Sequence, residues 1–229
     1  MVILGDSIVA GWGLSPQESY PSLLQRRLAP QGWQVINAGV PGETIVQGAL
    51  RYDRDVAARQ PNLVLLAFGL NDGCPVRNAS DRWREQLLIS RLLGCERAWL
   101  RLSRRLPWRY REPRPGRPRT RPALFQSTLT RLARKSRRLG AEVCLLSLTP
   151  VDGPRLPWPS QWQSYRRFHE IIAGVARRER LSYLDLWTDG EPAFDGDTMW
   201  RADGVHLEAA GARWLADRVH AHLAAEGML

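Results

Sequence analysis

The run Leu63-Val64-Leu65-Leu66-Ala67-Phe68 constrains the fold of this chain more than any other stretch. Every residue in it is apolar, which is the pattern of a strand buried on both faces of a parallel sheet. Further short strands are predicted at residues 2–4, 33–37, 143–148 and 181–186. Helical segments separate these strands, and that alternation predicts a parallel sheet with helices on both faces and right-handed crossovers.

The segments between the strands carry the signals of amphipathic helices. Apolar residues recur at helical spacing towards the end of the segment 16–28. Thr44 is expected to cap a helix that runs to about Arg59, and Pro61 ends it. The remaining helices are expected at residues 123–139, 162–178 and 208–223.

The length of 229 residues fits one α/β domain with a sizeable core. No apolar run reaches the ~18 residues that a membrane-spanning helix needs, and the first strand leaves no room for a signal peptide. Cys74, Cys95 and Cys144 lie far apart without a CxxC pair. We therefore expect reduced thiols and a cytoplasmic protein. A start codon assigned too late would instead allow a periplasmic or secreted one.

One segment carries the positive charge of the chain. Residues 77–138 contain 18 arginines and one lysine against four acidic residues, a net charge of +15, so the remainder carries −5 of the total of +10. Within this segment, residues 78–122 break the alternation of strands and helices and are interpreted as an insertion. Residues 81–106 fit a basic amphipathic helix, and residues 107–122 are too rich in proline for regular structure.

Three interpretations of the insertion remain open. It is a solvated segment of an arginine-rich chain, a surface that sits on anionic lipid through the helix at 81–106, or a nucleic-acid-binding module. Because no nucleic-acid-binding motif accompanies the arginines, nucleic acid is the least favoured partner.

Small and polar residues follow the predicted strands at one edge of the sheet. Ser7 lies in the turn Gly5-Asp6-Ser7 after the first strand, and Gly39, Asn71 and His206 follow the second, third and fifth. Parallel sheets bind ligands beyond the carboxyl ends of their strands. This edge is therefore the predicted site.

These residues supply what acyl transfer needs. Ser7 is the candidate nucleophile, His206 the base, and Asp203 the group that orients the imidazole. The candidate oxyanion donors are the N–H groups of Ser7 and Gly39 and the side-chain amide of Asn71. A glycine at position 39 lets the backbone approach closely.

The ordered set resembles the SGNH hydrolase family, also called GDSL esterases and lipases. Its four blocks match Gly5-Asp6-Ser7, Gly39, Gly69-Leu70-Asn71-Asp72 and Asp203-Gly204-Val205-His206. Residues 5–14, 18–21 and 37–44 look like the family's bacterial thioesterase, lysophospholipase and arylesterase branch. The resemblance implies a single domain over residues 1–229 with a flavodoxin-like three-layer α/β/α sandwich and strand order 2-1-3-4-5. It also implies the triad and donor roles given above, with no metal or cofactor. The arginine-rich insertion departs from the family and leaves substrate range open.

The predicted substrate is a carboxylic ester or thioester, with lipid or acyl esters favoured and a carbohydrate O-acetyl ester as the alternative. Trp12, Trp158 and Trp162 are candidates to contact the substrate. Trp158, Trp162 and Tyr165 could equally pack the loop after the fourth strand. An α/β-hydrolase is disfavoured because no Gly-x-Ser-x-Gly occurs. A metal hydrolase is disfavoured because the other histidines lack ligand spacing. The rival of another class is a non-catalytic protein that binds through the basic helix.

Overall fold

The computed structural model describes residues 1–75, 117–156, 159–190 and 198–229. Its centre is a sheet of five parallel strands in the order β2-β1-β3-β4-β5. The order and direction of the strands confirm the sequence prediction. The strands are β1 Val2–Gly5, β2 Ile36–Gly39, β3 Leu63–Ala67, β4 Glu142–Leu146 and β5 Ser182–Leu184.

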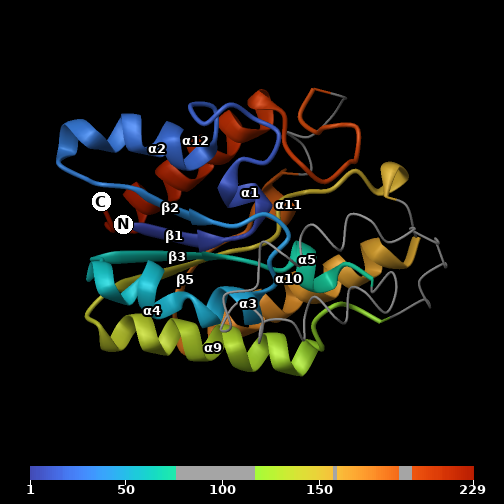
Figure 1. Ribbon diagram of the computed structural model, residues 1–229, viewed down its shortest axis with the longest axis horizontal. Helices are drawn as coiled ribbons and strands as arrows, with labels where there is room; N and C mark the ends of the chain where they lie inside the picture. The colour runs from blue at the N-terminus through green and yellow to red at the C-terminus, as the bar shows by residue number, and fades with distance from the viewer. Residues whose placement is uncertain (76–116, 157–158, 191–197) are drawn as a thin grey trace, which may run out of the picture.

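Helices cover both faces of the sheet (Figure 1). The helices are α1 Ser7–Ala10, α2 Tyr20–Leu28, α3 Ile45–Leu50, α4 Tyr52–Asp55, α5 Leu70–Gly73, α9 Pro122–Arg138, α10 Pro159–Glu179, α11 Leu186–Gly190 and α12 Ala209–Ala225. Single 3-10 turns occur at η1 Ala29–Gln31, η2 Ala57–Arg59 and η3 Gly153–Arg155. Helices α2 and α12 lie on one side, and α3, α4 and α9 lie on the other.

The strands bury both of their faces, and alternate residues feed separate cores because strand side chains alternate in direction. Leu4 and Leu66 pack with Phe125 of α9 in one core. Ile3 and Leu65 pack into the other core, whose further members on α2 and α12 include Tyr20, Leu24, Leu215 and Val219. The result is the predicted three-layer arrangement, and it explains why the β3 segment is apolar throughout.

The prediction of one helix from Thr44 to Arg59 was wrong, because the chain forms α3, α4 and η2 instead. Thr44 does cap α3, and its backbone N–H donates to Gln47 Oε1 at 2.8 Å. The helix breaks at Arg51, which leaves helical geometry at φ −100° and ψ 2°. The Arg51 side chain is buried, with Nε donating to Glu43 Oε2 at 2.6 Å. Tertiary contacts of this kind override local helical preference.

Several strand boundaries also differ from the prediction, among them the start of β2 and the end of β5. β2 begins at Ile36 rather than Trp33. β5 ends at Leu184, and Leu186, which was expected to be the last residue of the strand, is the first residue of α11. The cause is a long-range contact, because Ser147 Oγ after β4 accepts the N–H groups of Leu186 and Trp187 at 2.8 and 3.1 Å. The hydroxyl satisfies two donors at the start of α11 that have no partner within the helix.

The predicted helix at 81–106 and most of the insertion at 78–122 lie outside the described residues. The segment 117–121, described just before α9, is tied to the end of α5. Pro75 and Pro118 form an antiparallel bridge, and Thr120 N–H donates to the carbonyl of Asp72 at 3.1 Å. Within the described ranges, no helix combines the length and apolar character that crossing a membrane requires.

Candidate active site

Ser7 occupies a tightly built turn between β1 and α1. A side chain at Gly5 would come within 2.5 Å of the Ala67 carbonyl oxygen, so the close approach of β1 and β3 requires glycine there. Asp6 caps α1, and its Oδ1 accepts the N–H of Ile8 at 3.0 Å. The Ser7 side chain is thereby fixed at the carboxyl edge of the sheet, where it is almost fully buried.

His206 and Asp203 meet Ser7 across the sheet edge. Ser7 Oγ and His206 Nε2 are 2.9 Å apart, and His206 Nδ1 and Asp203 Oδ2 are 2.6 Å apart. The other oxygen of Asp203 accepts the N–H groups of Val205 and His206 at 3.0 and 2.9 Å. The structure therefore brings together the three side chains that the sequence assigned to nucleophile, base and orienting carboxylate.

The hydrogen bonds of Asp203 set its charge and the tautomer of the ring. Partial burial alone would raise the pKa of Asp203, but the hydrogen bonds from the His206 ring and from the backbone N–H groups hold that pKa below its usual value. An ionised carboxylate only accepts hydrogen bonds, so a neutral His206 carries its proton on Nδ1. Its Nε2 then faces the Ser7 hydroxyl as an acceptor.

The position of His206 in the chain differs from the prediction that it directly follows the fifth strand. Helix α11 lies between β5 and the loop that carries His206. Contacts from Arg201 hold that loop in place. Its backbone N–H donates to the His206 carbonyl at 2.7 Å, and its Nη1 donates to the Gly13 carbonyl at 2.9 Å. The loop is thus fastened to the segment that follows the Ser7 helix.

The predicted oxyanion donors differ in whether they already have a hydrogen-bond partner. Asn71 lies in α5, and its Oδ1 accepts from Arg119 Nη1 at 3.2 Å while its side chain also hydrogen-bonds to Asp6. The Gly39 N–H donates to Asn37 Oδ1 at 2.9 Å, so it is not available as a preformed donor. Gly42, in the next turn, has φ +80°, and its N–H has no hydrogen-bond partner among the described residues.

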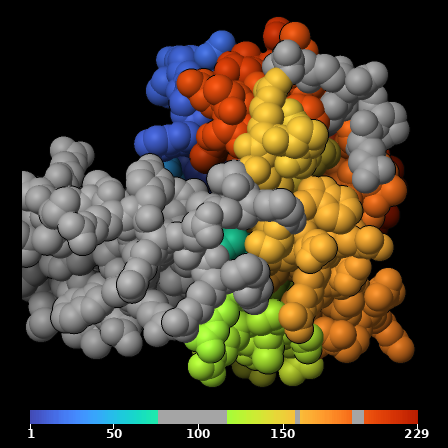
Figure 2. Space-filling view, turned by 90° about the vertical axis from the view of Figure 1, so that its right-hand side faces the viewer, coloured from blue at the N-terminus to red at the C-terminus, as the bar shows by residue number. Residues whose placement is uncertain are grey.

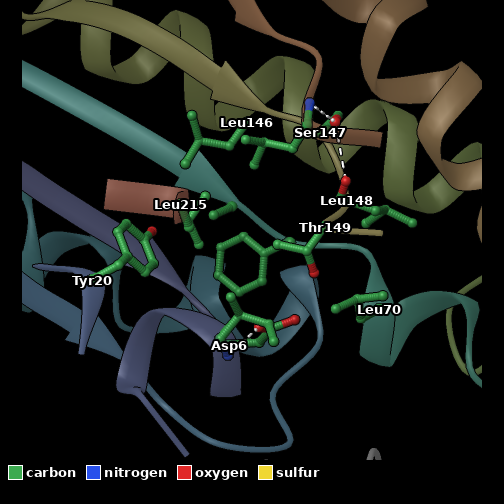
Figure 3. Close-up of a pocket in the computed structure, with 12 residues that line it drawn as sticks. Asp6, Tyr20, Leu70, Leu146, Ser147, Leu148, Thr149 and Leu215 are labelled. Atoms are coloured by element: carbon green, nitrogen blue, oxygen red, sulfur yellow. Dashed lines mark hydrogen bonds between the residues drawn. The ribbon is translucent and has the colours of Figure 1, made fainter. Parts of the chain in front are cut away.

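Asp6, next to Ser7, lies in a largely apolar environment. It lines a small cavity together with Leu70, Leu146 and Leu215 (Figure 3). Burial raises the pKa of Asp6 to about 6, against the opposing effects of the Ile8 N–H and nearby polar and charged groups. Figure 3 also labels Tyr20 and Thr149 among the side chains around this cavity.

Asp72 braces the loop after β3. Both of its carboxylate oxygens lie 3.1 Å from the N–H of Ile45, the first residue of α3. Burial raises the pKa of Asp72 to about 7, and a hydrogen bond from the Thr120 side chain acts in the opposite direction. Asp72 therefore links α3, α5 and the segment before α9 behind the site.

A pocket with a volume of about 380 Å³ opens at the triad. Figure 2 looks onto this end of the molecule, where α5 (teal) shows between the loop after β4 (yellow) and the start of α9 (green). The pocket is lined by Ser7, Leu70, Asn71, Cys74, Arg155, Gln161, Tyr165, Asp203, Val205 and His206.

The three predicted substrate-contacting tryptophans have different positions. The Trp12 ring is 55% exposed and its centroid lies 6.3 Å from that of His206. Trp162 does not line the pocket and packs instead near Trp187, with centroids 6.0 Å apart. Trp158 lies outside the described residues.

Sequence reasoning missed several residues that line the pocket or contact its lining. Arg155 is held by Asp152, with Nε and Oδ2 2.9 Å apart. Gln161 Nε2 donates to the hydroxyl of the buried Tyr165 at 2.5 Å. Arg119 contacts the lining residue Asn71. No motif marks these positions, and the tryptophans and Tyr165 after the fourth strand were the only sequence signal near them. Among the described residues, no cluster of side chains could hold a metal ion.

A serine, a histidine and an aspartate joined by hydrogen bonds at the carboxyl edge of a parallel sheet form an arrangement that can support hydrolysis. The chain belongs to the GDSL-like lipase/acylhydrolase family, whose model matches residues 3–214. It is an ester-cleaving hydrolase.

Three known proteins illustrate the relationship. The esterase TesA of Pseudomonas aeruginosa is 28% identical over 96% of this chain and 85% of its own length. Thioesterase 1/protease 1/lysophospholipase L1 of Escherichia coli is 36% identical over 38% of this chain and 41% of its own length. The crystal structure of a lipase/acylhydrolase from Enterococcus faecalis superposes with a TM-score of 0.69, covering 97% of this chain and 93% of that one, at 23% identity. That last likeness establishes the fold.

Proposed function

We propose that this chain hydrolyses carboxylic esters or thioesters of acyl groups through a covalent acyl-enzyme on Ser7. The observation that carries the proposal is the continuous chain of hydrogen-bonding atoms from Ser7 Oγ through the His206 ring to Asp203. A nucleophile within hydrogen-bond reach of a base that a third group orients is the geometry of nucleophilic catalysis.

The first half of the reaction acylates Ser7. His206 Nε2 takes the Ser7 hydroxyl proton as Oγ bonds to the substrate carbonyl carbon, whose oxygen becomes negative. The resulting imidazolium is stabilised by Asp203. The bond from carbon to the leaving oxygen or sulfur then breaks, and His206 gives its proton to that leaving atom.

Water completes the cycle. His206 takes a proton from a water molecule as its oxygen attacks the acyl carbon, and the bond from that carbon to Oγ then breaks. The proton returns to Ser7, and the carboxylic acid leaves. Substrate and water supply every atom, so the residues of the chain account for each proton transfer.

We assign three hydrogen-bond donors to the oxyanion: the Ser7 N–H, the Asn71 side-chain amide and one glycine N–H after β2. A donor that is already paired must break its hydrogen bond before it can serve, whereas an unpaired donor is preorganised. The Gly39 N–H is paired with Asn37, and the Gly42 N–H is not paired among the described residues. We therefore take Gly42 as the third donor in place of Gly39.

Lipid or acyl esters are the favoured substrates. Leu70, Val205 and the Tyr165 ring give the pocket apolar walls beside Ser7, and apolar walls suit the hydrocarbon of an acyl chain. Two relatives are named as an esterase and as a thioesterase and lysophospholipase. We further propose that residues 1–229 act as one domain, with residues 78–122 as an insertion.

Hydrolysis of p-nitrophenyl esters from acetyl to long acyl chains tests the proposal, with wild type and Ser7→Ala measured side by side. We expect turnover with medium or long chains, reduced by at least about 10⁴-fold in Ser7→Ala. A Ser7-dependent preference for acetyl would favour a carbohydrate O-acetylesterase. Full activity in Ser7→Ala would overturn the mechanism. No activity on any ester would instead favour a binding role.

A further inference from the structure

Arg119 contacts the active site from a distant part of the sequence. It lies 48 residues after Asn71, yet its Nη1 is 3.2 Å from Asn71 Oδ1. The backbone on either side is fixed, because the Arg119 N–H donates to the Cys74 carbonyl at 2.9 Å and Thr120 N–H donates to the Asp72 carbonyl. The guanidinium is therefore held against α5 by a backbone that is itself hydrogen-bonded to α5 and to Cys74.

The chemistry of the contact determines which way the Asn71 amide faces. A guanidinium group has only donors, so it can bond to the carbonyl oxygen of an amide and not to its NH₂. On its other side, the Asn71 side chain hydrogen-bonds to Asp6 and lowers the pKa of that carboxyl. An ionised carboxylate only accepts hydrogen bonds, so an ionised Asp6 faces the NH₂. Arg119 and Asp6 thus impose the same orientation.

The charge of Arg119 reinforces this arrangement. Burial raises the pKa of both Asp6 and Asp72, and the positive charge of Arg119 is among the effects that oppose the rise. Two other groups face Asp6: His206, which acts in the same direction as Arg119 when its ring is protonated, and Asp72, whose negative charge opposes the ionisation of Asp6. A cation near two buried carboxyl groups favours their ionised forms, and an ionised Asp6 is the better acceptor for the Asn71 NH₂.

We propose that Arg119 is a positioning residue that holds the Asn71 amide with its NH₂ turned towards the carbonyl oxygen of the substrate. The proposal rests on the function proposed above, in which Asn71 is an oxyanion donor. Negative charge on that oxygen develops only in the transition state, so a misoriented donor lowers kcat and leaves KM nearly unchanged. The insertion at 78–122 would thereby contribute to catalysis through the point at which it rejoins the domain.

The test compares Arg119→Met, which keeps the length of the side chain without a donor, with Arg119→Lys, which keeps one charged donor. Arg121→Met is the matched control, since it removes the same charge two residues away from an exposed position outside the pocket. With a p-nitrophenyl ester, Arg119→Met should lower kcat by about tenfold or more at unchanged KM. Arg119→Lys should recover part of that loss, and Arg121→Met should match wild type.

A double-mutant comparison separates positioning from other roles. In an Asn71→Ala background the amide is absent, so adding Arg119→Met should cause no further loss of kcat. An equal fold-loss in both backgrounds would overturn the proposal, as would a rise in KM at unchanged kcat. If Arg119→Met does not fold by circular dichroism, Arg119→Lys is carried through the same comparison. Wild-type kcat in Asn71→Ala alone would instead show that the proposed donor role of Asn71 fails.

Discussion

Asp203 holds His206 through two kinds of contact. One carboxylate oxygen accepts a hydrogen bond from the His206 ring, and the other accepts hydrogen bonds from two backbone N–H groups of the same loop. The loop backbone therefore fixes the carboxylate, and the carboxylate fixes the ring. Replacing the oxygen that faces the ring should disturb the tautomer of His206 and leave the loop in place.

Asp203→Asn tests this division of labour. Its remaining oxygen can still accept the backbone N–H groups, but its NH₂ would donate to Nδ1 and place the ring proton on Nε2. His206 could then no longer accept the Ser7 proton, and we expect kcat to fall by about 10⁴-fold with little change in KM. Steady-state kinetics on a p-nitrophenyl ester measure the effect. A loss of less than tenfold would argue against His206 as the base.

Asn37→Ala tests which glycine supplies the third oxyanion donor. The substitution frees the Gly39 N–H from the Asn37 side chain. If Gly42 is the donor, as proposed, kcat should stay within about twofold of wild type, because the freed group takes no part in the reaction. A clear rise in kcat would mean that Gly39 is the donor and that Asn37 competes for it.

The break between α3 and α4 is built around Arg51. Its guanidinium contacts Glu43 Oε2 at 2.6 Å, Asp55 Oδ2 at 2.8 Å and the Gly5 carbonyl at 3.1 Å. Gly5 directly precedes the Asp6-Ser7 turn. The interruption of the helix thus carries a buried cation that ties α3 and α4 to the strand leading into the nucleophile.

Arg51→Ala should be strongly destabilising, because it leaves Glu43 buried without its guanidinium. We expect the free energy of unfolding to drop by about 3–5 kcal/mol. Arg54→Ala is the matched control, since Arg54 pairs with the same Asp55 from a side chain that is 75% exposed, and its loss should cost less than about 1 kcal/mol. Urea unfolding monitored by circular dichroism gives both values, and equal losses would contradict the assignment.

The elements that sequence predicted correctly are those whose signals are local. The apolar run of β3, the cap at Thr44 and the turn before Ser7 each follow from a few adjacent residues. The errors at Arg51 and at the end of β5 arose from contacts with residues distant in sequence, which no local pattern encodes. The same limit applies in the site. Ser7 and Asn71 follow from the strand-end rule, whereas Arg119 depends on where a long insertion rejoins the domain.

Over the whole molecule, two buried carboxyl groups behind the site should make stability depend on pH. Burial raises the pKa of Asp6 to about 6 and that of Asp72 to about 7, from an ordinary value of 3.8. Between about pH 4 and pH 7 these two groups therefore bind more protons in the folded chain than in the unfolded chain, and their contribution to the free energy of unfolding falls as pH rises. His169 and His222 act oppositely as pH rises towards 6.5, because burial lowers their pKa.

Asp6→Asn isolates one of these groups, because asparagine is an equally good N-cap for α1. The wild-type free energy of unfolding, minus that of the variant, should fall by on the order of 3 kcal/mol between pH 4 and pH 8. Urea unfolding at a series of pH values measures the difference. Parallel curves for the two proteins would contradict the raised pKa of Asp6.

The central claim, an acyl-enzyme on Ser7 formed with His206 as base, is tested most directly by mass spectrometry of the protein after reaction with a fluorophosphonate. Such a reagent phosphonylates an activated serine and stays attached. We predict one adduct per chain, located on the peptide that contains Ser7 and absent in His206→Ala. An adduct on another serine, or none on a correctly folded wild-type protein, would contradict the account.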